Sequence, residues 1–353
     1  MPTKPTKPTK PTIAPIPHLE AGLLDAAVLA LIGLGVTAEL RPATARQANP
    51  RMRLRYGAQT INFVIEVKRL VNQANLGVIA HRLAHLDQPL LVTDYVTLPV
   101  AQRLRELKIE FIDTAGNAYI ERPPLLIWAN GNKPAQKLPE TRTTRAFQPG
   151  GLKLIFALLC QPELINANYR TIAEAADVAL GTVGWVAGDL KDAGFMIDLG
   201  KRGRKLTNKR KLLDLWVEGY ARQLRPKCLV GRYRALRPDW WKDTHPAKLH
   251  FQWGGETAAA KMTGHLKPAV TTLYTTGDPK EQQTVVKEFR LVKDAAGDVE
   301  IRENFWKFVE GGDATMVPPL LTYADLLATA DDRNIETAQI IYDDHLARLI
   351  ETA

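Results

Sequence analysis

Residues 169–195 read YRTIAEAADVALGTVGWVAGDLKDAGF and set the architecture of the middle of the chain. Thr171 and Glu174 have the spacing of a capping box, which predicts a helix beginning at Thr171. Leu180-Gly181 then supplies a turn, and Thr182 is placed to cap a second helix. Two helices joined by so short a turn are typical of a helix-turn-helix.

The second helix is expected to have one apolar and one polar face. Its apolar positions recur at i, i+3 and i+7 and are Val183, Val186 and Leu190. Thr182, Trp185 and Lys191 fall on the opposite face, which we predict to enter the major groove of DNA. The alternative for Trp185 is that its ring packs in the protein core.

A basic hairpin, residues 196–207, follows this helix. Gly194 ends the helix, and two strand-like runs flank the turn Gly200-Lys-Arg-Gly203. Helix, helix-turn-helix and hairpin in this order predict a winged helix, whose wing contacts phosphates beside the groove. The cations that we assign to DNA binding are Lys201, Arg202, Arg204, Lys205, Lys209 and Arg210.

Positive charge is concentrated around this hairpin. The 353 residues include 47 Lys+Arg and 38 Asp+Glu, a net charge of +9. Residues 199–237 alone hold 13 cations and 2 acids, a net charge of +11, so the remainder of the chain is slightly acidic. Localised basicity of this kind is expected of a phosphate-binding face, and a merely solvated surface is the alternative.

Composition restricts the class of protein. Hydrophobic residues make up 45% and charged residues 24%, as in soluble folded chains. The two cysteines, Cys160 and Cys228, exclude a disulfide framework and fit a reducing cytosol. The longest apolar stretch, residues 26–36, is too short to span a bilayer, and the histidines lack metal-ligand spacing. We therefore expect a cytoplasmic protein with no membrane contact, no metal and no cofactor.

The first 130 residues alternate helices and strands. Residues 1–19 carry a Thr-Lys-Pro repeat, which predicts a disordered tail. Over residues 20–130 we predict helices at 23–36, 75–86 and 98–107, and strands at 37–41, 52–56, 60–68, 89–92, 109–113 and 118–121. This alternation implies an α/β domain with a mixed sheet covered by helices.

The third predicted strand ends in an E-x-K pair, Glu66 and Lys68. Metal-dependent nucleases use such a pair, because a carboxylate helps to hold magnesium and a lysine orients the attacking water. The order of elements around it resembles the PD-(D/E)XK nuclease superfamily, in which the preceding strand carries a second acid. Here that strand, residues 51–56, carries arginines, and only Glu39 matches an accessory acid. We predict a nuclease-like scaffold without catalysis, and an active magnesium-dependent nuclease is the alternative.

The rest of the chain divides at a polar connector. Residues 131–150 are rich in Pro, Gly, Thr and Arg and predict a linker. We expect a winged-helix domain at 151–212 and a mixed α+β domain at 213–353, which ends in a long helical pattern from residue 334 to 351. Residues 323–353 hold seven acids and two arginines, which predicts a contact for a basic partner, a cover for the DNA-binding face or a solvated surface.

Several stretches resemble AbiEi-type antitoxins and their relatives. They read PLLVTDYV (89–96), LRELKIEFIDTAGNAYI (104–120), WGGETAAAKMTGHLKP (253–268), DLLAT (325–329) and RNIETA (333–338). The resemblance covers roughly residues 20–350. It implies a type IV toxin–antitoxin regulator that binds promoter DNA through a winged helix, with a nucleotidyltransferase toxin encoded beside it. The family's winged helix usually lies at the N-terminus, whereas this chain places it after the nuclease-like domain.

These observations predict a DNA-binding transcriptional regulator that represses its own promoter as an antitoxin. Its expected partners are the double-stranded DNA of that promoter and a cognate nucleotidyltransferase toxin. One alternative is the active nuclease, delivered to DNA by the winged helix. Another is a protein-interaction module that neutralises a toxin without contacting DNA.

Overall fold

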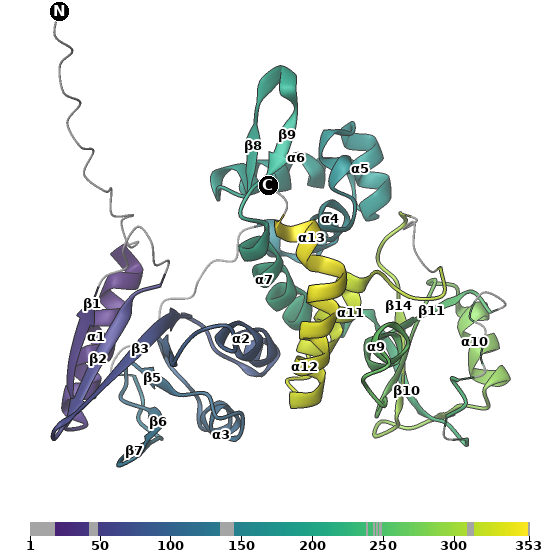
Figure 1. Ribbon diagram of the computed structural model, residues 1–353. Helices are drawn as coiled ribbons and strands as arrows, with labels where there is room; N and C mark the ends of the chain where they lie inside the picture. The colour runs from purple at the N-terminus through teal and green to yellow at the C-terminus, as the bar shows by residue number, and fades with distance from the viewer. Residues whose placement is uncertain are drawn as a thin grey trace, which may run out of the picture. The chain divides into compact units, whose positions relative to one another are not determined.

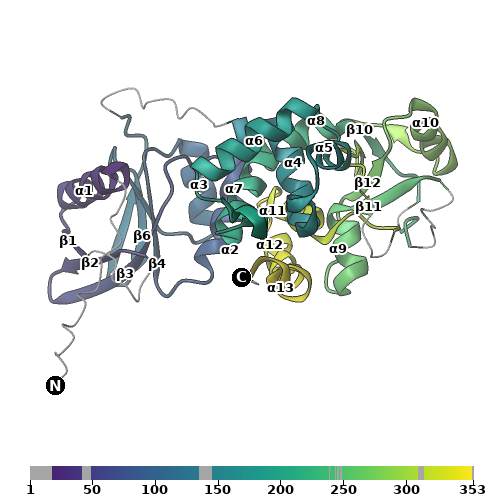
Figure 2. The ribbon, with the colours of Figure 1, turned by 90° about the horizontal axis from the view of Figure 1, so that it is seen from above.

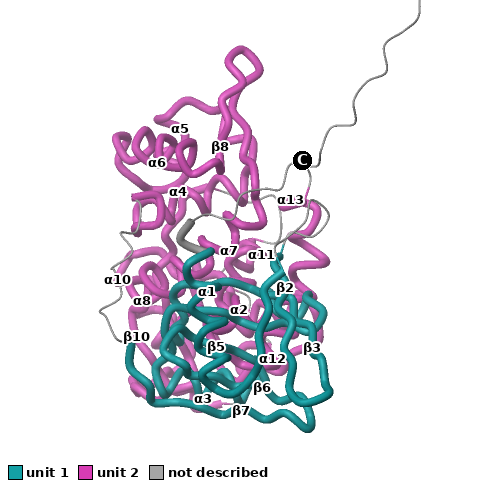
Figure 3. Tube along the Cα trace, turned by 90° about the vertical axis from the view of Figure 1, so that its left-hand side faces the viewer, with its two compact units in different colours: residues 1–73, 82–140 teal, residues 74–81, 141–353 magenta. Residues whose placement is uncertain are grey.

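The computed structural model describes residues 18–41, 49–134, 145–237, 239–242, 244, 246, 249–308 and 314–351. The chain forms two compact units (Figure 3): unit 1 comprises residues 1–73 and 82–140, and unit 2 comprises residues 74–81 and 141–353. The predicted tail lies outside the described residues, except for residues 18 and 19, which open the first helix. Residues 135–144 of the predicted linker also lie outside them. The domain boundaries at 20–130, 151–212 and 213–353 stay predictions.

Unit 1 is built on a seven-stranded sheet whose strands lie side by side in sequence order (Figure 1). The strands are β1 (Thr37–Arg41), β2 (Arg51–Tyr56), β3 (Gln59–Val67), β4 (Pro89–Thr93), β5 (Phe111–Asp113), β6 (Ala118–Arg122) and β7 (Leu125–Ala129). Strands β3, β4 and β5 run parallel, and every other neighbouring pair is antiparallel. Parallel neighbours need crossover connections, which here contain α2 (Leu76–Leu83) and α3 (Leu98–Glu106).

One face of this sheet carries the core of unit 1. Helix α1 (His18–Gly33) lies along the sheet (Figure 2) and buries Leu24, Ala27 and Leu31 in the same cluster as Phe63 and Ile65 of β3. Because successive strand residues point to opposite faces, the buried positions of β2 alternate with its arginines. The arginines therefore lie on the face of the sheet away from α1.

The predicted elements of unit 1 agree with the structure in type and order. Strand β1 has the predicted bounds, whereas α1 begins five residues before the predicted start and ends at Gly33. The chain turns there through Gly35, whose φ of 83° favours glycine. Strand β7 was not predicted; it follows Pro123-Pro124 and pairs antiparallel with β6.

The first part of unit 2 is mainly helical. It contains η2 (Arg145–Phe147), α4 (Pro149–Cys160), η3 (Pro162–Asn166), α5 (Tyr169–Ala176), α6 (Leu180–Asp192), β8 (Met196–Asp198), η4 (Gly200–Arg202) and β9 (Arg204–Leu206). Strands β8 and β9 pair antiparallel, with Ile197 opposite Lys205, and form the predicted basic hairpin. A longer helical segment follows, made of α7 (Lys209–Gly219), the π-helical turn η5 (Tyr220–Leu224) and α8 (Arg225–Cys228).

The second part of unit 2 contains a five-stranded sheet in the order β11-β12-β14-β10-β13. These strands are β10 (Leu229–Arg234), β11 (Phe251–Gly254), β12 (Thr271–Thr275), β13 (Val292–Lys293) and β14 (Val299–Glu303). Helices α9 (Gly255–Thr263) and α10 (Pro279–Glu288) connect them. The chain continues through α11 (Pro319–Leu327), α12 (Asp332–Ile341), the π-helical turn η7 (Tyr342–Leu346) and α13 (Ala347–Glu351).

A single buried cluster joins the helical and mixed parts of unit 2. It includes Leu152 and Phe156 of α4, Trp216 of α7 and Leu321 and Ile341 of the last helices. The rings of Phe156 and Trp216 stack with centroids 5.2 Å apart. The chain is therefore a mixed α+β protein. Across the part of the chain that the structure describes, every helix is too short or too polar to cross a bilayer.

Candidate nucleic-acid interface

Helix α5 begins two residues earlier than its sequence pattern predicts. The Asn168 side chain caps it, because Asn168 Oδ1 accepts a hydrogen bond from the backbone N–H of Thr171 at 2.9 Å. The predicted start at Thr171, with Glu174 closing a capping box, is therefore wrong. The helix ends at Asp177, which adopts the left-handed conformation with φ 52°. Asn168 has the residue type and spacing of an N-cap, a signal that the stronger Thr171–Glu174 pattern obscured.

Helix α6 also starts earlier than expected. Its N-cap is Ala179, whose side chain accepts no hydrogen bond, so the predicted capping by Thr182 is wrong. Thr182 instead lies half-buried in the first turn. The predicted apolar face is confirmed, because Val183, Val186 and Leu190 are all buried.

Trp185 lies on the outer surface of α6. Its side chain is 64% exposed, which excludes the alternative that the ring packs in the core. Arg145 Cζ lies 4.8 Å from the centroid of this ring, a distance typical of a cation–π contact. Lys191, in the last turn of the same helix, is also exposed. Helix α6 thus presents an aromatic ring and an ammonium group to solvent, and η2 adds the guanidinium of Arg145 over that ring.

Asp189 of α6 contacts η2, the short helix that precedes α4. Its Oδ2 accepts a hydrogen bond from the backbone N–H of Ala146 at 3.0 Å. The contact fixes η2 beside α6, and η2 carries the Arg145 that lies over Trp185. Arg145 was missed by the sequence reasoning because it stands 40 residues from Trp185 in a polar connector.

The basic hairpin exposes three of its four cations. Lys201 and Arg202 form its tip, and Lys205 lies on β9. Gly200 and Gly203 flank the tip with φ values of 62° and 82°, which other residues rarely adopt. Three positive charges are therefore exposed along a narrow projection (Figure 1), two of them at its tip and one on β9.

Arg204 has a different environment from its neighbours. Its backbone N–H donates to Asn166 Oδ1 at 2.7 Å, and its Nη2 donates to the carbonyl of Ala167 at 3.0 Å. The guanidinium carbon lies 5.3 Å from the ring centroid of Tyr169. Arg204 therefore fastens the hairpin to the segment before α5.

Lys209 and Arg210 contact the C-terminal helices. Lys209 Nζ donates to the carbonyl of Leu349 at 2.9 Å, and burial together with the charge of Lys205 lowers the pKa of Lys209. Arg210 lies 4.1 Å from the ring centroid of Tyr342 and pairs with Asp214 at 3.5 Å. Both side chains are partly buried, in contrast to the exposed tip of the hairpin.

Some of the remaining cations of residues 199–237 pair with acids. A buried network in unit 2 contains Tyr220, Arg225, Tyr274, Glu300, Arg302 and Asp325. Asp325 accepts hydrogen bonds from the hydroxyls of Tyr220 and Tyr274, at 2.8 and 2.9 Å. Arg225 lies 3.0 Å from Asp325 and 3.4 Å from Glu300, and Arg232 also pairs with Glu300. Part of the basic segment thus balances buried acids, which sequence position alone does not reveal.

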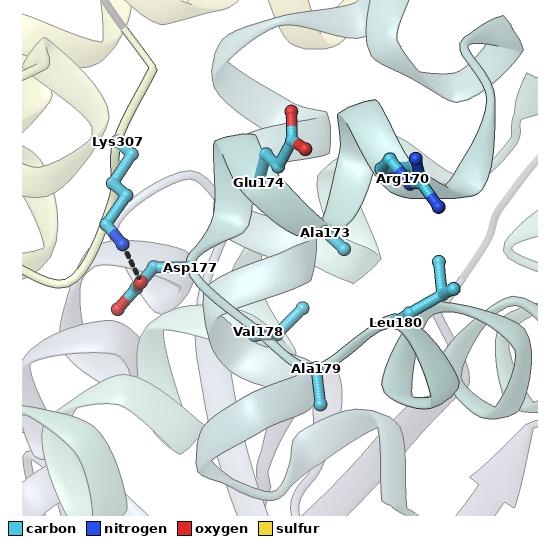
Figure 4. Close-up of a pocket in the computed structure, with 8 residues that line it drawn as sticks. All are labelled: Arg170, Ala173, Glu174, Asp177, Val178, Ala179, Leu180 and Lys307. Atoms are coloured by element: carbon cyan, nitrogen blue, oxygen red, sulfur yellow. Dashed lines mark ion pairs between the residues drawn. The ribbon is translucent and has the colours of Figure 1, made fainter.

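A pocket of about 550 Å³ lies at the turn between α5 and α6 (Figure 4). Arg170 and Glu174 line it from α5, and Lys307 reaches it from the segment after β14. Lys307 Nζ lies 2.6 Å from Asp177 Oδ1, and Lys153 Nζ lies 3.1 Å from Asp177 Oδ2. The hydrogen bond from Lys307 lowers the pKa of Asp177. Lys153 and Lys307 therefore both pair with the carboxylate of Asp177 at the turn between α5 and α6.

The E-x-K residues of unit 1 make contacts within the protein. Glu66 is buried, and its carboxylate lies 3.0 Å from Arg82 Nε and 3.2 Å from Asn49 Nδ2. Lys68 follows the end of β3, and its backbone N–H donates to the carbonyl of Val92. Within the described ranges, no three His, Cys, Asp or Glu side chains are grouped so that they could hold a metal ion.

Glu39 lies far from this pair along the sheet. It is paired with Arg53 in the strand register, and Arg53 is paired with Asn62. Glu39 is therefore level with Asn62, four residues before Glu66, which is about 13 Å along the strand. This register separates Glu39 from Glu66, so the two do not form the acidic pair that the superfamily's chemistry requires.

Part of unit 2 matches a known protein family. Neither the curated proteins nor the solved structures gave a match to this chain. The helix-turn-helix region and the whole of unit 1 lie outside the residues matched by a family, so their resemblances stay predictions. Residues 205–347, less than half of the chain, match a family described as "Transcriptional regulator, AbiEi antitoxin, Type IV TA system".

Proposed function

We propose that this protein is a DNA-binding transcriptional regulator of the type IV toxin–antitoxin kind. In this proposal it is the antitoxin, it represses its own promoter, and a nucleotidyltransferase toxin is its partner. The family similarity of residues 205–347 supports the regulator and antitoxin assignment. The proposed place of action is the cytoplasm, where both the promoter and the toxin are accessible.

The exposed Trp185, together with the basic hairpin, carries the DNA-binding part of the proposal. Helices α4, α5 and α6 followed by β8 and β9 have the order of a winged helix, in which the second helix of the pair enters the major groove. Trp185 is exposed on that helix, and Lys201, Arg202 and Lys205 project from the hairpin. In this proposal the aromatic ring faces the base edges and reads the sequence. The cations face the phosphates and position the protein on the duplex.

Unit 1 serves in this proposal as a nuclease-like scaffold without catalysis. Support comes from the partners of Glu66, whose carboxylate already contacts Arg82 and Asn49. A magnesium ion is normally held by carboxylates and phosphate oxygens that are accessible to it. We therefore propose no enzymatic activity for the protein.

A mobility-shift titration with the protein's own promoter region tests the proposal. Replacing Lys201, Arg202 and Lys205 with Ala removes three exposed cations, while Arg204 stays in place to hold the hairpin. Each lost phosphate contact removes about 0.9 from the slope of log K against log salt, so the slope should flatten by about 3. A matched variant replaces the exposed Lys280, Lys287 and Lys293 and should leave the slope unchanged.

The outcomes separate the possible functions. An unchanged slope in the hairpin variant would contradict the winged-helix assignment. Failure of the wild-type protein to shift any duplex, together with stable binding to the toxin encoded beside it, would favour a protein-interaction module.

A further inference from the structure

A row of arginines occupies the face of the unit 1 sheet away from α1. This arginine ladder consists of Arg41 on β1 and Arg51, Arg53 and Arg55 on β2. Consecutive ladder residues on β2 are two positions apart and therefore about 7 Å apart on one face. Their neighbours Met52 and Leu54 point into the core under α1 and fix the direction of the arginines.

The ladder is charged and open to solvent. Arg41, Arg51 and Arg55 are exposed, and among the described residues none of the three has a carboxylate within ion-pair distance. Arg53 is the exception, because it lies 3.9 Å from Glu39 and 3.4 Å from Asn62. The ladder with Glu39 therefore carries four positive charges and one negative charge.

The register places two of these cations directly opposite each other. Arg41 pairs with Arg51 across the antiparallel β1–β2 ladder. Like charges at directly opposite positions destabilise a sheet, and neither arginine lies within ion-pair distance of a carboxylate among the described residues. An anion bound between the two guanidinium groups would remove the repulsion. The arrangement is therefore costly for the free protein and favourable for a complex with a polyanion.

We propose that the arginine ladder binds the phosphate backbone of duplex DNA. Arginine is suited to this role because its planar guanidinium donates two parallel hydrogen bonds to phosphate oxygens. The ladder therefore presents regularly spaced guanidinium groups to the regularly spaced phosphates of a DNA strand. The choice of DNA as the polyanion rests on the proposed function. The ladder itself is independent of the winged-helix assignment, because it shares no residue with α6 or the hairpin.

An acidic protein is the less suitable partner for this face. Protein interfaces concentrate aromatic and aliphatic side chains at their centre and exclude charge from it. Most side chains between and beside the arginines are polar instead, namely Thr37, Glu39, Thr60 and Asn62, whereas Val64, opposite Arg51, is apolar and half-buried. Polar and charged side chains thus dominate the face that we assign to phosphate contacts.

The test measures binding of the full-length protein to a mixed-sequence duplex as a function of salt. A ladder variant carries Arg41→Gln, Arg51→Gln and Arg55→Gln, and we expect its slope of log K against log salt to flatten by about 3. Arg→Lys substitutions at the same positions should keep the slope, because they keep the charge, but weaken binding. The matched control is the variant with Lys280, Lys287 and Lys293 replaced by Gln. Thermal unfolding should show a ladder variant at least as stable as the wild type, because the Arg41–Arg51 repulsion is gone.

Two results would overturn the ladder proposal. One is an unchanged slope in the ladder variant while the hairpin variant flattens it, an outcome that leaves the proposed function intact. The other is binding of polyglutamate that the ladder substitutions abolish without any change in DNA binding, which would assign the face to an acidic protein. A flattened slope in the ladder variant with no effect of the hairpin substitutions would support the ladder and contradict the winged helix.

Discussion

Arg145 lies over the indole ring of Trp185, with its guanidinium carbon 4.8 Å from the ring centroid. The two residues come from different elements, η2 and α6, and the Asp189–Ala146 hydrogen bond holds these elements together. The contact limits the orientations of an otherwise exposed ring. A ring held in one orientation loses less side-chain entropy when it binds, which favours a binding role over a purely structural one.

Replacing Trp185 with Ala should weaken binding to the preferred promoter site and leave the fold intact. Loss of one base-reading contact costs about 1–3 kcal/mol on the specific site and little on random DNA. Competition titrations with both duplexes measure this difference. Leu126→Ala, at a side chain 63% exposed in unit 1, is the surface control. Unfolding of unit 2 in the Trp185 variant would show that the ring has a structural role.

Replacing Arg204 with Ala should destabilise the hairpin, unlike replacement of its neighbour Arg202. The Arg204 side chain donates to the carbonyl of Ala167 and lies over Tyr169, so its removal leaves a partly buried acceptor without its donor. A lost hydrogen bond of this kind costs about 1–3 kcal/mol. Thermal unfolding followed by circular dichroism measures the change. Equal midpoints for the Arg204 and Arg202 variants would contradict the anchoring role.

The stability of unit 2 should fall in acid. Burial alone would raise the pKa of Glu300, but the charges of Arg302, Arg225 and Arg232 outweigh it, and the pKa lies below its ordinary value of 4.5. A carboxyl group whose pKa is lowered by folding stabilises the folded state above its unfolded pKa, and this contribution is lost as the pH falls through the folded pKa. Urea unfolding at a series of pH values should therefore show decreasing stability below about pH 4.5.

Tryptophan fluorescence suits this measurement, because six of the seven tryptophans lie in residues 141–353. Glu300→Gln should lower stability at neutral pH and reduce the dependence on pH in acid. A wild-type protein whose stability is constant from neutral pH to below the ordinary pKa of glutamate would contradict the assignment of Glu300 as a charged member of the network.

Purified protein should not nick supercoiled plasmid in magnesium or manganese. Metal-dependent hydrolysis needs carboxylates that hold the ion and activate water, and Glu66 instead contacts Arg82 and Asn49. The register also keeps Glu39 about 13 Å away along the sheet. Agarose electrophoresis after incubation with each metal measures nicking. Nicking that disappears in Glu66→Ala and Lys68→Ala variants would establish the active nuclease.

The sequence predicted regular elements well because their signals are local. The alternation of buried and exposed residues along β2 follows its printed pattern, and the apolar face of α6 is buried as expected. The N-caps were less predictable. Asn168 and Thr171 both qualify by residue type, and only the folded backbone decides which of them stands at the cap.

The partners of charged residues were not predictable from sequence. Arg225 stands 100 residues from Asp325, and Lys209 stands 140 residues from Leu349. A cation in a basic stretch looks the same in sequence whether it meets solvent, a buried carboxylate or a carbonyl group. The sequence also left the exposure of Trp185 undecided, because an aromatic side chain on a helix can either pack in the core or face solvent.

The π-helical turn at Tyr220–Leu224 gives the helix from residue 209 to 228 one residue more than a regular helix with the same number of turns. Because the turn absorbs this residue, deleting one residue within it would restore a regular helix and keep Arg225 nearly in phase with α7. In a regular helix, by contrast, a change of one residue rotates everything beyond it by about 100°. A one-residue insertion after the turn would rotate Arg225 away from Asp325 and Glu300, and the two acids of the buried network would lose a compensating charge. Deletion of one residue within the turn is therefore expected to be better tolerated than insertion of one.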